Sequence, residues 1–306
     1  MKLLFFDDFR FGALKGADRV VDLSDEVAGI PQLGPQDVIR GVINNWGSYK
    51  SKLEAAVEAA DGVPVSSVRL RPPLPKPTNI DCMAVNYMED GTRDAPAQIN
   101  IFTKSPFSVI GDGDTMVLTD VPATIFEGEA ELALVIGKDG SNIAEADAFD
   151  HIFGYINFID GSARGLPEGG FTTMKGRDTF APIGPYLVTA DEIADPQKLG
   201  VTLTNNGKVQ QKFNTDDMAH NIARCVEFVT SIHPVEAGDI IATGTNHGGL
   251  NSFQDGDHVT LEVEGLGVLN VHVKDNLKRT WGRETRKEMA AKGQEGTTPQ
   301  ISGKYA

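Results

Sequence analysis

The segment 126–138 (FEGEAELALVIGK) constrains the fold of this chain more than any other stretch. Three glutamates, Glu127, Glu129 and Glu131, alternate along it and precede an apolar run, residues 132–136, that ends at a glycine. Alternation at period two places all three carboxylates on one face of a strand. The apolar run predicts that the same strand continues into the core.

The acidic face of this strand has two interpretations. Carboxylates at the mouth of a buried strand repel one another and lose hydration, so they stay ionised only where a cation compensates them. A hard divalent ion with oxygen ligands, Mg²⁺ or Mn²⁺, meets that requirement. The alternative is the solvated acidic edge of a strand, which the E-x-E pattern alone does not exclude.

The composition is that of an ordinary globular protein and argues against two classes of partner. The chain has 306 residues, of which 40% are hydrophobic and 23% charged, and its formal net charge is −15. Such a charge disfavours nucleic acid and anionic membrane surfaces as partners. The two cysteines, Cys82 and Cys225, have neither disulfide nor metal spacing, and we find no signal peptide or membrane-spanning apolar run. We expect a cytoplasmic protein.

Three blocks downstream of the glutamate strand complete an ordered set. They read GYINFIDGSARG with Asp160, MKGRDTFAPIGPYLV with Lys175, and AGDIIATGTNHGG with a glycine-rich loop at 243–249. Together the four blocks resemble the fumarylacetoacetate hydrolase family, whose members carry E-x-E-L-A/V, N-D-x-S-A-R, K-x-x-D…P-x-G-P and G-D-x-I-x-T-G-T. The resemblance covers roughly residues 76–275. It implies a β-rich α+β fold with a mixed β-sandwich or β-roll catalytic domain.

A proline-rich segment and the extent of the resemblance divide the chain into three parts. The run PPLPKP at residues 72–77 predicts an extended linker, because proline fixes φ and disfavours helix at the preceding residue. We therefore expect a small N-terminal α+β module over residues 1–75 and the catalytic domain over residues 76–277. Residues 278–306 are expected to form a charged C-terminal tail that is mobile or lies against a partner subunit. The resemblance also implies a homodimer.

The resemblance implies a set of site residues. The family's metal ligands, two glutamates and one aspartate, fall on Glu129, Glu131 and Asp160. The positions that contact the substrate or line its pocket fall on Tyr87, Lys175, Gly244 and Thr245. A lysine near a metal site can stabilise a developing enolate, which gives Lys175 a catalytic role as well.

Three further charged residues are expected to support this site without taking part in the reaction. Arg164 falls on an arginine that holds the aspartate loop in the family, and the alternative for it is a bidentate clamp on a substrate carboxylate. Lys104 follows a predicted strand and is expected to be structural. Glu127 is expected either to contact the metal ligands without binding the metal or to lie on the surface.

The water-activating pair departs from the family pattern. Family hydrolases carry N-Y-x-x-H-x-x-E, and here the histidine and glutamate positions fall on Asp90 and Arg93. His247 lies in the glycine-rich loop and could act as a general base near neutral pH. Asp90 and Glu89 are the other candidates for replacing the pair. A loop histidine without chemistry is the alternative for His247.

Three functions are compatible with these residues. The first is a metal-dependent hydrolase that cleaves a C–C bond in an acylpyruvate-like 2,4-dioxo acid through a metal-bound enolate. The second is a lyase on the same metal, either a 2-oxo acid decarboxylase or a 2-keto-3-deoxy sugar acid dehydratase or hydratase. The third is a non-catalytic binding protein, against which the retained carboxylates and Lys175 argue. In each case the expected ligand is a small 2-oxo or 2,4-dioxo acid.

Overall fold

The computed structural model describes residues 1–294 and 296–306. Among these residues the strands form one large mixed sheet, a smaller sheet and a two-stranded ribbon, and the helices are short. This arrangement confirms the predicted β-rich α+β fold. No described helix combines the length and the apolar character that a membrane crossing requires.

The elements have the following bounds. The large sheet contains β1 (Lys2–Phe6), β2 (Arg10–Lys15), β3 (Arg19–Asp22), β4 (Val63–Pro64), β5 (Leu70–Arg71), β6 (Ile80–Met83), β7 (Ile101–Thr103), β8 (Val109–Ile110), β10 (Ile125–Ile136), β11 (Ile152–Arg164), β12 (Ala181–Thr189) and β15 (Ile240–Ala242). The smaller sheet contains β9 (Thr115–Val117), β13 (Gly200–Asn205), β14 (Lys208–Asn214), β16 (His258–Val263) and β17 (Val268–Lys274). The ribbon pairs β18 (Thr280–Trp281) with β19 (Gln300–Ser302). The α-helices are α1 (Pro35–Asn44), α2 (Trp46–Ala59), α3 (Phe171–Lys175), α4 (Ile222–Ile232) and α5 (Arg286–Ala291).

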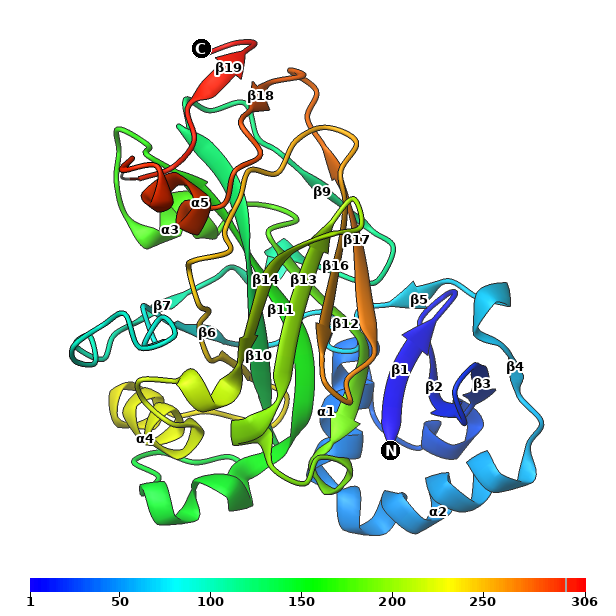
Figure 1. The fold of residues 1–306 in the computed structure, drawn as a ribbon. Coiled ribbons are helices and arrows are strands. Elements are labelled where there is room, and N and C mark those ends of the chain that lie inside the picture. Colours follow the sequence, from blue (N-terminus) through cyan, green and yellow to red (C-terminus); the bar gives the residue numbers. More distant parts are fainter. Residues whose placement is uncertain (295) are drawn as a thin grey trace.

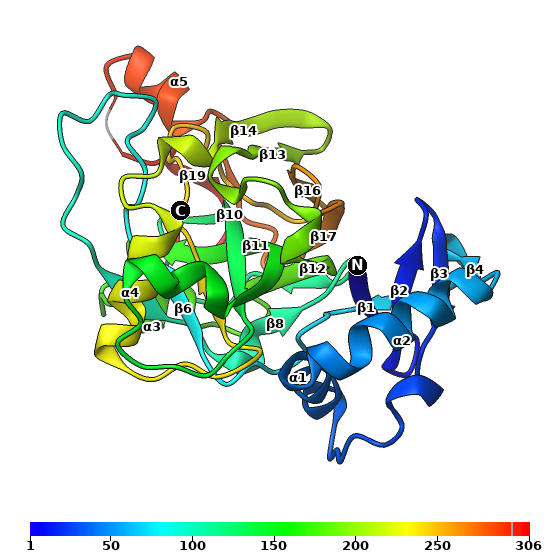
Figure 2. The ribbon, with the colours of Figure 1, turned by 90° about the horizontal axis from the view of Figure 1, so that it is seen from below.

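The two sheets pack face to face around the longest strands. The large sheet runs in the order β4-β3-β2-β1-β12-β11-β10-β15-β6-β7, and the smaller one in the order β14-β13-β16-β17-β9. Strands β13, β16 and β17 lie against β10, β11 and β12, as Figures 1 and 2 show from two directions. The result is a β-sandwich whose core lies between these strands.

Strand β10 is buried along its whole length, and its alternate residues face two different apolar clusters. Leu132 and Leu134 belong to the cluster that includes the smaller sheet, whereas Ala133 and Val135 belong to the cluster that includes the N-terminal strands and helices. Because side chains alternate along a strand, the odd-numbered glutamates share the face of Ala133 and Val135. The burial predicted for this strand from its apolar run is confirmed.

The N-terminal strands join the large sheet directly. Strand β1 pairs antiparallel with β12, with Leu3 opposite Leu187, so the sheet continues from the N-terminal residues into the rest of the chain. The N-terminal elements lie beside the sandwich in Figure 2, with α1 and α2 covering one face of the sheet. The division near residue 75 and the homodimer stay predictions.

The C-terminal segment packs on its own chain. Trp281 is buried, and its ring lies 5.9 Å from that of Phe126 on β10. Arg279 is fully buried and forms an ion pair with Asp275, with 3.0 Å between Nε and Oδ2. Residues 279–281 are therefore anchored and do not belong to a mobile tail. A few buried anchors fix the segment despite its high content of charged residues.

Candidate metal centre and active site

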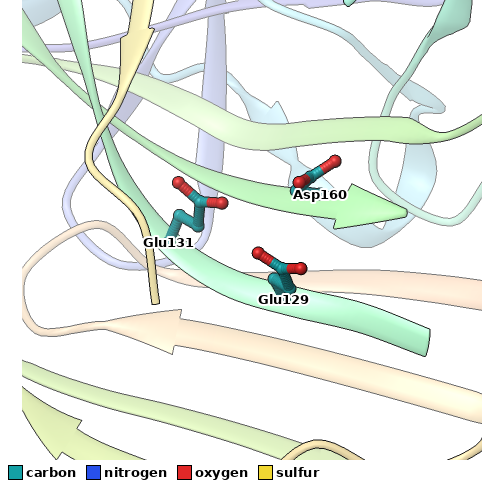
Figure 3. A group of neighbouring side chains, drawn as sticks. All are labelled: Glu129, Glu131 and Asp160. Atoms are coloured by element: carbon teal, nitrogen blue, oxygen red, sulfur yellow. The ribbon is translucent and has the colours of Figure 1, made fainter. Parts of the chain in front are cut away.

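Three carboxylates meet where β10 and β11 pair. The antiparallel register places Glu129 directly opposite Asp160, and Glu131 lies two residues further along the same face of β10. One oxygen from each of the three carboxylates lies within 4.8 Å of the other two, and all three residues are buried. Figure 3 shows the side chains projecting from the two neighbouring strands toward one another. The group predicted from the sequence is thus assembled by strand pairing.

Two buried lysines compensate part of this negative charge. Nζ of Lys175, at the end of α3, lies 2.7 Å from Oε1 of Glu129 and also donates to Asp160. Nζ of Lys104 lies 2.6 Å from the other oxygen of Asp160, Oδ1. Burial acts to lower the pKa of Lys175, but the carboxylates of Asp160 and Glu129 raise it above its ordinary value. Lys175 is therefore held at the triad as a cation.

Glu131 carries the least compensated charge of the triad. Its Oε2 accepts a 2.6 Å hydrogen bond from the backbone N–H of Gly244, whereas its buried Oε1 has no partner among the described residues. Burial and the charges of Asp160 and Glu129 raise the pKa of Glu131 well above its ordinary value. An orphaned carboxylate oxygen beside two further carboxylates is a donor set suited to a hard divalent cation. The residues present therefore fit Mg²⁺ or Mn²⁺.

The glycine-rich loop is fastened beside the triad. Gly244 has φ +86°, a conformation that favours glycine, and a Cβ atom there would make a tight contact, 3.0 Å from Cβ of Asn86. The hydroxyl of Thr245 is buried and accepts a 2.8 Å hydrogen bond from Nε2 of Gln211. Gln211 also donates to the carbonyl of Asn246 at 2.7 Å. These bonds fix the loop that carries the two predicted substrate-binding residues.

His247 and Glu89 form a hydrogen-bonded pair. Nδ1 of His247 lies 2.6 Å from Oε1 of Glu89, and the backbone N–H of His247 donates to Oε2 at 2.8 Å. Burial acts to raise the pKa of Glu89, but the hydrogen bonds and charge of His247, with Arg93, lower it below its ordinary value. The chain thus has a His–Glu pair built from residues outside the family's usual positions.

The backbone around Glu89 is in a conformation that L-residues rarely adopt. Glu89 and Asp90 have φ values of +57° and +55°. Consecutive non-glycine residues in this region are strained and cluster at functional sites. The turn directs Glu89 to His247 and leaves Asp90 exposed, with its N–H bonded to Asp217. The structure therefore does not bring the Asp90 side chain to the pair.

His247 also acts electrostatically on the triad. Burial acts to raise the pKa of Glu129. The charges of Lys175, Arg164 and His247 outweigh it and lower that pKa below its ordinary value. The pair formed by His247 and Glu89 therefore lies within electrostatic reach of a candidate metal ligand.

Tyr87 is more deeply buried than a residue that lines a pocket needs to be. It is fully buried, its ring packs edge-on against Phe213 at 5.0 Å, and its hydroxyl has no partner among the described residues. Burial and the nearby charge of Glu131 raise the pKa of Tyr87 well above its ordinary value. Tyr87 is thus a neutral hydroxyl group near the triad.

Glu127 is a buried part of the site and not a surface group. Its Oε2 accepts hydrogen bonds from Nε of Arg164 at 2.6 Å and from Nη2 of Arg286 at 2.5 Å. Arg164, at the end of β11, also donates to Glu129 and therefore links β11 to β10. Arg286 was not among the residues predicted from the sequence, because it lies outside the region of resemblance.

The match to known proteins extends over most of these elements. Residues 80–274 match the family model described as fumarylacetoacetate (FAA) hydrolase C-terminal. The chain belongs to the fumarylacetoacetate hydrolase family. It is 37% identical over 220 residues to oxaloacetate tautomerase YisK of Bacillus subtilis (strain 168), covering 67% of this chain and 73% of that protein. It is 28% identical over 290 residues to maleylpyruvate hydrolase of Aquipseudomonas alcaligenes, covering 90% of this chain and 99% of that enzyme.

Solved structures of the family have the same fold. The maleylpyruvate hydrolase of Sphingobium sp. SYK-6, crystallised with manganese(II) and pyruvate, superposes with a TM-score of 0.82 at 31% sequence identity. The match covers 90% of this chain and 99% of that one. The family match and these related enzymes confirm the prediction that the chain is a family enzyme.

Proposed function

We propose that this chain is a divalent-metal-dependent hydrolase that cleaves a C–C bond in an acylpyruvate-like 2,4-dioxo acid. The observation that carries the proposal is the pair of His247 and Glu89, because His247 lies three residues after Gly244, whose N–H donates to Glu131 of the carboxylate triad. Glu129, Glu131 and Asp160 would hold Mg²⁺ or Mn²⁺, which when bound supplies a Lewis acid for the 2-oxo group. The complex of a related maleylpyruvate hydrolase with manganese(II) and pyruvate supports this choice of metal and substrate class.

The chain's own residues bind and orient the substrate. The ammonium group of Lys175, held between Glu129 and Asp160, is placed to stabilise negative charge that develops on the 2-oxo oxygen. The hydroxyl of Thr245 accepts from Gln211 and donates only a long, 3.5 Å bond to the carbonyl of Asn246, so its proton can turn to the substrate carboxylate. The buried surroundings exclude bulk water and strengthen these interactions.

The His–Glu pair supplies the proton transfers. Glu89 accepts from Nδ1 of His247, which leaves Nε2 as the basic nitrogen. His247 takes a proton from water while the water oxygen bonds to the distal carbonyl carbon of the substrate. The bond between that carbon and the methylene carbon then breaks, and its electron pair and the proton from His247 end on the methylene carbon. Pyruvate and a carboxylic acid are the products.

A tautomerase of a 2-oxo acid is the second candidate. It is favoured by the 37% identity to oxaloacetate tautomerase YisK and by the replacement of the family's water-activating residues by Asp90 and Arg93. Keto–enol exchange moves one proton between carbon and oxygen. It therefore needs His247 but no attacking water.

A substrate panel tests the proposal. The purified protein is incubated with acetylpyruvate, maleylpyruvate, oxaloacetate or a 2-keto-3-deoxy aldonate, with Mn²⁺ or with EDTA, and the products are identified by NMR. Two carbon fragments from a dioxo acid, lost in EDTA, support the hydrolase. Accelerated enol–keto exchange of oxaloacetate without fragments supports the tautomerase. Release of CO₂ or loss of water without cleavage supports the lyases.

A further inference from the structure

The side chain of Arg286 connects the short helix α5 to β10, the strand that carries two of the candidate metal ligands. Arg286 contacts Glu127 with two parallel hydrogen bonds, from Nη2 to Oε2 at 2.5 Å and from Nε to Oε1 at 3.2 Å. Such paired bonds between guanidinium and carboxylate fix orientation as well as distance. Glu127 is buried on β10, two residues before the candidate ligand Glu129. Arg286 thereby anchors α5 to the buried strand β10.

The same helix holds the loop that carries His247. The backbone N–H of Arg286 donates to the carbonyl of Leu250 at 3.0 Å, and that of Lys287 donates to the carbonyl of Gly248 at 2.9 Å. These acceptors lie one and three residues after His247. The loop contains Gly248 and Gly249, whose lack of a side chain gives the backbone little intrinsic rigidity. Its position therefore depends on external contacts such as these two.

Local sequence explains why α5 forms here. Thr285 and Glu288 make a capping box, in which Thr285 Oγ1 accepts from the N–H of Glu288 at 3.2 Å and Glu288 Oε2 accepts from the N–H of Thr285 at 2.7 Å. A six-residue helix is marginal without tertiary contacts, so its placement rests on its partners. The segment lies beyond residues 80–274, which match the family model. The family match therefore does not account for this contact.

We propose that Arg286 is a positioning residue for His247. By tying α5 to Glu127, it fixes the two backbone contacts that hold the loop, and so keeps the imidazole against Glu89. The role of His247 in turnover rests on the function proposed above, whereas the effect on the loop does not. A general base must be held close to its working geometry, and a displacement of about 1 Å can cost a large factor in rate.

Hydrogen exchange measured by mass spectrometry tests the loop directly. In Arg286→Gln, the backbone amides of residues 246–250 should exchange on the order of tenfold faster than in the wild-type protein. Arg283→Gln is the matched control, because Arg283 makes a similar two-bond contact to Asp257 at 2.7 and 2.8 Å, and its further contact, with the carbonyl of Ser252, lies outside the measured residues. The control should leave exchange in the loop unchanged. Arg286→Lys keeps the charge but loses the paired hydrogen bonds to Glu127, so it should restore only part of the protection.

Kinetics give a second readout on any substrate that the wild-type enzyme turns over. Arg286→Gln should lower kcat roughly tenfold with KM nearly unchanged, because the triad and Lys175 stay in place. Binding of Mn²⁺ measured by calorimetry should change less than kcat. The same loss in Arg283→Gln, or loop exchange that Arg286→Gln leaves unchanged, would overturn the proposal. If the wild-type protein turns over no substrate, the proposed function fails. The hydrogen-exchange experiment still tests whether Arg286 positions the loop.

Discussion

The backbone N–H of Gly244 donates a 2.6 Å hydrogen bond to Oε2 of Glu131, which joins the glycine-rich loop to the carboxylate triad. The other oxygen of Glu131 is buried and has no partner among the described residues. Burial, Asp160 and Glu129 together raise the pKa of this carboxyl group. Glu131 is therefore the candidate ligand whose charge costs most without a cation and gains most from one.

Glu131→Gln should separate metal binding from stability. We expect the Mn²⁺ affinity to fall by about 100-fold or more. This loss is at or above the upper end of what is typical for residues that only support the metal ligands. The melting temperature of the metal-free protein should rise by about 2–4 °C, because a neutral amide replaces a carboxyl group whose pKa the folded state raises at a cost in stability, while an acceptor for Gly244 remains. Titration calorimetry with MnCl₂ and scanning calorimetry in EDTA measure the two effects.

Glu127→Gln is the matched control for that substitution. The change and the strand are the same, but Glu127 is paired with Arg164 and Arg286. Its replacement leaves Arg286 without its carboxylate and Arg164 with Glu129 alone, so the melting temperature should fall. A lower melting temperature for Glu131→Gln, or unchanged Mn²⁺ affinity, would contradict the assignment of Glu131.

Substitutions in the His–Glu pair should act as a unit. His247→Gln should lower kcat by about 10²–10⁴, the usual contribution of a general base. Glu89→Gln should have a smaller effect of the same kind, and the double variant should be no slower than His247→Gln alone. Asp90→Asn is the control and should keep wild-type turnover, because Asp90 is exposed. Equal losses in Asp90→Asn and Glu89→Gln would refute this assignment.

The carboxylate triad could be predicted from the sequence because its determinants are local. Period-two alternation fixes the common face of Glu129 and Glu131 within one strand. The position of Asp160 opposite Glu129 depends on the register between β10 and β11, which alternation does not specify. The resemblance to the family supplied it. The resemblance to the family also supplied the prediction of a β-rich fold.

The pairing of His247 with Glu89 could not be predicted in this way. The two residues are 158 positions apart and lie in loops, where no periodic pattern records a contact. Glu89 and Asp90 are equally acidic neighbours, and only the left-handed turn at both residues decides which one faces the histidine. Arg286 lies in a segment whose charged composition suggested a tail. Its contact with Glu127 depends on tertiary packing alone.

The pair of His233 and Asp81 should make stability depend on pH. Nε2 of His233 lies 3.1 Å from Oδ1 of the buried Asp81. Burial acts to lower the pKa of His233, but the Pro234 carbonyl and the charges of Asp81 and Asp239 raise it. Burial raises the pKa of Asp81 by more than His233 lowers it. Both groups therefore bind protons more tightly in the folded state than in the unfolded state.

The sign of this effect follows from linkage. Stability from His233 is complete below its unfolded pKa of about 6.5 and is lost as the pH rises through its raised folded pKa. The melting temperature should fall between about pH 6 and pH 8, and His233→Gln should flatten that fall. His272→Gln, at an exposed histidine, should keep the wild-type dependence. A wild-type slope in His233→Gln would exclude the pair as its cause.

Lys175→Met should make the protein depend on a divalent cation for stability. Lys175 is buried between Glu129 and Asp160, and removing one partner of a buried ion pair costs about 3–5 kcal/mol of unfolding free energy. A bound Mn²⁺ would supply the missing positive charge. We therefore expect a lower melting temperature in EDTA and a larger rise on adding MnCl₂ than in the wild-type protein.

Arg279→Met is the control for that comparison. Arg279 and Asp275 form an ion pair whose side chains are both 0% exposed, outside the triad. Its loss should destabilise the protein to a similar degree, but the rise in melting temperature on adding MnCl₂ should equal that of the wild-type protein. Equal rises in Lys175→Met and Arg279→Met would mean that Lys175 and the cation do not share the same carboxylates. A larger rise in Lys175→Met alone would locate the bound cation at Glu129 and Asp160.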